Sequence, residues 1–152
     1  MKPLFTSIAL IISLSSFSQL VGWSFDQVVK LKGTDYKYEI EGTDEEFGER
    51  YSITYKKEFY IDGKYARATE IFSFRKSSNI VFKYLFMGAK KETDILSIIE
   101  NNNQKFKVID KGNKQPDFIW HDEKANVNYQ LSVMSSIGNG EYKYINYFAI
   151  GE

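Results

Sequence analysis

The chain has 152 residues, no cysteine, and 20 basic against 20 acidic side chains. The absence of cysteine excludes a disulfide framework, thiol catalysis and a lipidated cysteine anchor. Balanced charge without a basic block argues against a nucleic-acid partner, because neutralising phosphates requires a concentrated positive surface.

Residues 1–18 have the layout of a secretory signal peptide, in which a lysine precedes an apolar run that ends in small residues. The run is shorter than the roughly 20 residues that a membrane-spanning helix needs. A buried N-terminal helix is the alternative, but the segment lacks a polar face. We therefore expect cleavage after Ser18, one mature domain over residues 19–152 without a stable membrane anchor, and a secreted or periplasmic location.

Two short helices are predicted, one in each half of the chain. In the first, Ser24 can cap the helix with Gln27 as its reciprocal partner, and Gly33 ends it. In the second, within residues 92–103, an isoleucine stripe lies ahead of three asparagines. Each helix has only one apolar side, so each must lie on a sheet to bury it.

Alternation of apolar and polar residues with a period of two predicts strands over much of the chain. Residues 36–40 (YKYEI) and 127–133 (VNYQLSV) have this pattern. Residues 52–74 read as a hairpin around Asp62-Gly63, a dipeptide that favours a tight turn. Residues 79–87 are apolar on both sides apart from one lysine. This last strand is therefore expected near the centre of the sheet.

The two halves show a similar pattern when one is shifted by 70 residues. Phe25 then falls on Ile95, and Gly33 falls on Asn103. We therefore predict an α+β fold, an antiparallel sheet with two short helices on one face, formed by tandem duplication of a helix plus three or four strands. The pseudo-repeats would span about residues 19–88 and 89–152.

His121 is the only histidine, and it follows Trp120 in the stretch IWHDE, residues 119–123. The alternation predicts a strand that pairs with residues 127–133 and ends in a turn, so His121 would lie near a hairpin end. A surface histidine is favoured over a general base, because no Gly-x-Ser-x-Gly elbow accompanies it. No second histidine or cysteine completes a transition-metal set, so we expect neither a metal nor a cofactor.

The acidic stretch EGTDEEFGE, residues 41–49, could offer oxygen ligands to calcium. It lacks the alternating Asp/Asn pattern and terminal bidentate Glu of a calcium loop, so a solvated hairpin connection is favoured. Paired carboxylates for glycoside hydrolysis are compatible with the sequence, since their separation is spatial, but nothing selects a pair.

The chain is rich in tyrosine, with 11 of them among 152 residues. Tyrosine rings pack well in a core and also make good contact surfaces. If helices cover one face of the sheet, tyrosines on the other face are available to a partner. The candidate binding residues, all on predicted strands, are Tyr60, Tyr65, Tyr84, Trp120, His121 and Tyr144.

These features favour an exported, non-enzymatic binding module that contacts a protein or another macromolecule outside the cytoplasm. The contact would use the open sheet face and the loops at 41–49, 62–64 and 121–126, with aromatic anchors inside a polar rim. A secreted protein that binds a small ligand or a glycan is the alternative. A small hydrolase that combines carboxylates with His121 is the third reading.

Overall fold

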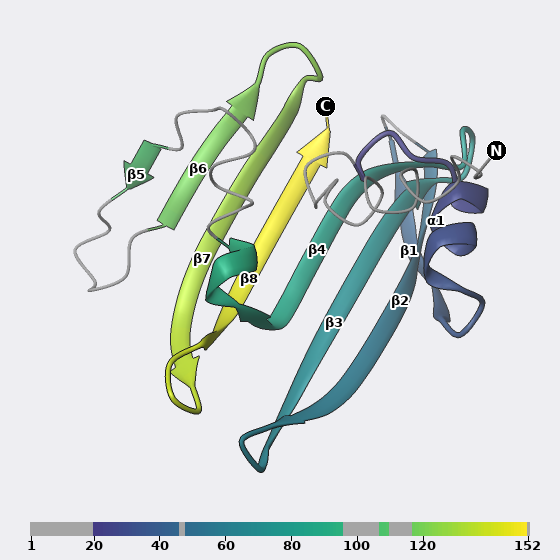
Figure 1. The fold of residues 1–152 in the computed structure, drawn as a ribbon. Helices are drawn as coiled ribbons and strands as arrows, with labels where there is room; N and C mark the ends of the chain where they lie inside the picture. The colour runs from purple at the N-terminus through teal and green to yellow at the C-terminus, as the bar shows by residue number, and fades with distance from the viewer. Residues whose placement is uncertain (1–19, 46–47, 96–106, 110–116, 152) are drawn as a thin grey trace, which may run out of the picture.

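Antiparallel strands form most of the computed structural model, which describes residues 20–45, 48–95, 107–109 and 117–151 (Figure 1). The elements are α1 (Phe25–Lys32), β1 (Lys37–Asp44), β2 (Gly48–Ile61), β3 (Lys64–Arg75), β4 (Ile80–Lys91), β5 (Lys107–Ile109), β6 (Asp117–Asp122), β7 (Val127–Ile137) and β8 (Tyr142–Gly151). The predicted signal peptide lies outside the described residues. Within them, no helix is long and apolar enough to cross a bilayer.

All eight strands belong to one sheet, in the order β1-β2-β3-β4-β8-β7-β6-β5. Every neighbouring pair is antiparallel. The central pair, β4 and β8, joins two meanders, β1–β4 and β5–β8, side by side (Figure 1). The central place predicted for residues 79–87 is confirmed, because β4 has a paired strand on both of its edges.

The hairpin around Asp62-Gly63 is also confirmed. Residues Ile61 and Lys64 pair across a two-residue turn. Asp62 and Gly63 have φ angles of 49° and 73°. Positive φ at both central residues is the geometry that matches the right-handed twist of the flanking strands. The turn therefore fixes the register of β2 and β3.

Helix α1 begins with the predicted capping box. The Ser24 hydroxyl accepts a hydrogen bond from the Gln27 amide, and the Gln27 side chain accepts one from the Ser24 amide. Residues 20–24 anchor the helix to β4, since the Gly22 amide donates to the Val81 carbonyl and the Val81 amide donates to the Trp23 carbonyl. The helix thus lies at the β1–β4 side of the sheet, with Val28 fully buried.

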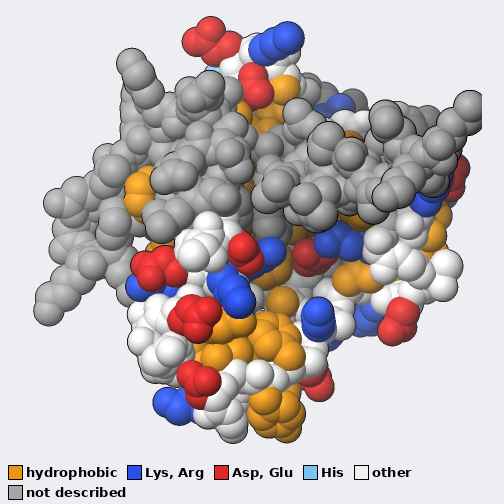
Figure 2. Space-filling view, viewed as in Figure 1, with side chains coloured by type: hydrophobic (Ala, Val, Ile, Leu, Met, Phe, Trp, Pro, Cys, Tyr) orange, Lys and Arg blue, Asp and Glu red, His pale blue; other side chains and the backbone are white. Residues whose placement is uncertain are grey.

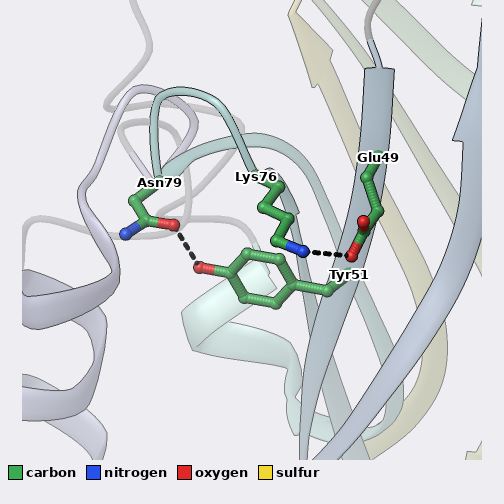
Figure 3. Close-up of polar contacts among 4 residues, drawn as sticks. All are labelled: Glu49, Tyr51, Lys76 and Asn79. Carbon is green, nitrogen blue, oxygen red and sulfur yellow. Dashed lines mark hydrogen bonds and ion pairs between the residues drawn. The ribbon is translucent and has the colours of Figure 1, made fainter.

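Side-chain contacts tie the β3–β4 turn to the start of β2 (Figure 3). The Tyr51 hydroxyl donates to Oδ1 of Asn79 at 3.0 Å, and Nζ of Lys76 lies 2.8 Å from Oε1 of Glu49. The Asn79 carbonyl also accepts from the amide of Phe25, the first residue of α1. One short turn therefore connects the helix and two strands.

The predicted α+β fold with a tandem duplication is wrong. The described residues form a single antiparallel β-sheet, and α1 is the one complete helix within the described ranges. Residues 92–95 are helical and Ile95 is buried in the core, but the rest of the second predicted helix lies outside those ranges. The two meanders also differ: β1 and β2 have 8 and 14 residues, whereas β5 and β6 have 3 and 6. An apolar stripe recurs wherever a helical turn covers a sheet, so the shared pattern did not require equivalent units.

Candidate functional site

The sheet has two faces, because successive residues of a strand point to opposite sides. The helix face carries the core residues that pack with Val28 and Ile95, such as Ile53, Phe72 and Tyr147. We call the opposite face the open face. The strand registers place on it, among others, Lys56, Glu58, Tyr60, Tyr65, Arg67, Met87, His121 and Tyr144.

Two of the predicted binding residues form an exposed pair at the end of the β2–β3 hairpin. Tyr60 and Tyr65 are directly opposite in the register, with ring centroids 6.1 Å apart and planes at 73°. Their exposed fractions are 74% and 51%. A hydrogen bond to the Glu58 carboxylate raises the pKa of the Tyr65 hydroxyl. The pair thus presents two rings to solvent with one hydroxyl oriented by a neighbouring charge.

A groove of about 610 Å³ lies on the open face beside this pair. Methionine and tyrosine side chains contribute its apolar surface, and charged side chains of β2 and β3 border it. The lining includes Lys56, Glu58, Arg67, Met87, Met134 and Tyr144. Met87 and Met134 are 38% and 49% exposed. We call this surface, together with the tyrosine pair, the open-face groove.

Gly88 allows β3 and β4 to approach closely at this groove. Its φ is 152°, and a Cβ atom built there would lie only 2.5 Å from the Cα of Ala68 and from the carbonyl oxygen of Arg67. A side chain at this position would therefore push the two strands apart. The glycine positions Met87 beside Arg67 and Thr69 in the lining of the groove.

Of the candidate binding residues on the central strands, Tyr144 lines the groove and Tyr84 does not. The Tyr84 ring is on the helix face, fully buried, with its centroid 4.9 Å from that of Phe72. Burial raises the pKa of its hydroxyl, with the Glu70 charge adding to the effect. Tyr84 is a core residue and is removed from the candidate surface.

Trp120 and His121 lie away from the groove, on β6. Trp120 is on the helix face and stacks on Tyr129, with centroids 4.3 Å apart and planes at 8°. His121 is exposed on the open face, in a separate depression of about 510 Å³. Its Nδ1 lies 2.9 Å from Oδ1 of Asn128, within hydrogen-bond distance. The predicted strand and hairpin-end position of His121 are confirmed.

Within 41–49, Glu41 and Glu49 take part in contacts along the sheet. Glu41 accepts a hydrogen bond from the buried Ser73 hydroxyl at 2.7 Å, and Glu49 pairs with Lys76. Residues 46–47 lie outside the described part of the chain. In that part, no group of three or more histidine and carboxylate side chains is arranged to hold a metal ion.

The two groove methionines were missed from the sequence. Met87 belongs to a segment that is apolar on both sides in the sequence, but alternation with Leu85 and Lys83 places it on the open face. Met134 follows Val133, where the β7–β8 register shifts. The alternation of residues along β7 therefore does not assign Met134 to either face of the sheet. For Met87, the alternation with Leu85 and Lys83 was the signal available in the sequence.

Comparison of the chain with family models, with curated proteins and with solved structures found no match. The function is therefore inferred from the sequence and from the geometry of the described residues.

Proposed function

We propose that this protein is an exported, non-enzymatic binding module that recognises a protein partner through the open-face groove. The observation that supports it is the exposure of Tyr60 and Tyr65 beside a groove that contains two exposed methionines. Aromatic residues, methionine and arginine are enriched in protein interfaces, while such side chains give a folded monomer little stability when they are solvated.

The tyrosine pair provides the anchors. A tyrosine ring has few rotatable bonds, so fixing it in an interface costs little entropy, and its hydroxyl can keep a hydrogen bond at the rim. Methionine side chains adapt to the shape of an apolar partner surface. On binding, Tyr60 and Tyr65 would enter the partner surface, and Met87 and Met134 would pack around them.

The charged border provides selectivity. Glu58 and Arg67 are directly opposite in the β2–β3 register, and Lys56 lies one open-face position further along β2. Rim charges influence association rate and partner choice more than final affinity. The partner is therefore expected to present both charge signs around an apolar centre.

The test uses the full chain produced in a host that exports it. The protein is captured with its bound partners from the cell envelope or the medium and compared with the Tyr60→Ala/Tyr65→Ala variant. Loss of two central aromatic anchors is expected to weaken a specific complex by at least about 2 kcal/mol, or roughly 30-fold. Tyr38→Ala is the matched control, because Tyr38 is 50% exposed but lies in β1, on the helix face against Tyr51.

The proposal predicts a partner that the double variant loses and Tyr38→Ala retains. Equal retention by both variants, with circular dichroism showing both folded, would contradict it. A partner that proves to be a glycan or a lipid would refute the protein-recognition part of the proposal.

A further inference from the structure

We infer that a second pocket, on the helix face, binds a small amphipathic anion, a molecule with one carboxylate or phosphate head and an apolar body. This lysine pocket has a volume of about 570 Å³ and lies between the end of α1, strands β2 to β4 and the start of β8. Its size is within the range typical of small-molecule sites. The inference does not rest on the proposed function, because neither Lys90 nor Phe86 lines the open-face groove, although Lys56, Lys57 and Ala68 line both surfaces.

The pocket has an apolar wall. Phe59, Ala68, Phe86, Ala89 and Tyr142 all line it. Figure 2 shows hydrophobic side chains gathered over the lower ends of the central strands, with lysine, arginine and carboxylate side chains around them. A small inorganic ion would leave this wall in contact with water, whereas an alkyl or aryl body would cover it.

The charge of the lining is positive. Five lysines and three carboxylates line the pocket among the described residues. One of the carboxylates, Glu70, is 16% exposed and already holds Lys32, with Oε2 2.6 Å from Nζ. Lys57, Lys90 and Lys91 add further positive charge around the apolar wall. This combination is complementary to an anion that carries an apolar body.

Lys90 is the residue best placed to hold the head group. Its Nζ lies 5.4 Å from the centroid of the Phe86 ring, at the apolar wall. Burial lowers the pKa of Lys90, and Lys32 and Lys57 add to this effect, while Asp94 and Glu70 oppose it. A bound anion would offset the cost of burying the ammonium and would favour its charged form. Binding should therefore weaken as the pH rises through the pKa of Lys90.

The experiment is calorimetric titration of the full chain with decanoate, decyl phosphate, decanol and acetate, each below its aggregation concentration. Binding of decanoate or decyl phosphate, together with much weaker binding of decanol and acetate, would support the inference, and the tighter of the two anions identifies the head group. Lys90→Gln is expected to weaken binding of the anion by about tenfold or more, and Lys90→Arg should restore most of it.

Lys124→Gln is the matched control, because this exposed lysine lies in the β6–β7 turn, outside the pocket lining. It should leave the affinity unchanged. Decanol binding as tightly as both anions, absence of binding by either anion, or equal affinity in wild type and Lys90→Gln would each overturn the inference. Lys57→Gln provides a second variant, expected to weaken binding in the same direction, should Lys90→Gln fail to fold.

Discussion

The helix face and the open face use the same residue types for different purposes. On the helix face, Tyr51 stacks between Tyr38 and Phe74, at centroid distances of 5.2 and 5.0 Å. On the open face, Tyr60 and Tyr65 touch each other and are largely exposed to solvent. The two faces differ because α1 and the helical turn at 92–95 pack over one of them and bury its side chains. A tyrosine in an alternating strand is therefore a core residue or a surface residue according to what packs over it.

Removal of a ring from the helix face should have the largest effect. Phe72 is fully buried and contacts the rings of Tyr84 and Tyr55. Phe72→Ala is expected to lower the free energy of unfolding by about 3–5 kcal/mol, because it removes apolar burial and leaves a cavity. Urea denaturation measures this change. A loss below about 1 kcal/mol would mean that the helix face is loosely packed, and the two faces would then not differ in packing.

The next largest effect is expected at high pH, through the buried hydroxyl of Tyr129. Burial raises the pKa of Tyr129 to about 12, whereas a tyrosine in an unfolded chain titrates near about 10. As the pH rises, the Tyr129 hydroxyl therefore loses its proton in the unfolded state before it does so in the folded state. The contribution of this group to the free energy of unfolding is complete below pH about 10 and is lost as the pH rises through about 12.

For this single group the loss between about pH 9 and about pH 11 is roughly 1 kcal/mol. Tyr129→Phe should reduce the measured fall in unfolding free energy by that amount. Identical pH dependence in wild type and Tyr129→Phe would contradict the assignment of Tyr129 to the core.

Removal of a ring from the open face should have the smallest effect. Tyr60→Ala is expected to change the unfolding free energy by about 1 kcal/mol or less, since the side chain loses little more than its edge contact with Tyr65. The same denaturation series measures it beside Phe72→Ala. A loss comparable to that of Phe72→Ala would show that Tyr60 belongs to the core rather than to a contact surface.

Local chemistry in the sequence predicted the elements that depend on neighbouring residues. The Ser24 cap, the Asp62-Gly63 turn and the strand that contains His121 all follow from such patterns. These features were predictable because a few adjacent residues determine each of them.

Features that depend on distant pairing were not predictable. Period two places Tyr84 on one face of β4, but only the pairing of β4 with β8 and the cover by buried core residues decide that this face is inside. The close approach at Gly88 involves Ala68, which lies on the neighbouring strand β3. The predicted fold class was wrong for the same reason, because two matching apolar stripes do not determine how many residues each strand contributes to the sheet.

The most direct test of the open-face groove is site-specific photo-crosslinking in the full, exported chain. A benzophenone side chain at position 60 should form an adduct with a protein partner, and the same group at position 38 on the helix face should not. An adduct formed from position 38 but not from position 60 would contradict recognition through the open face.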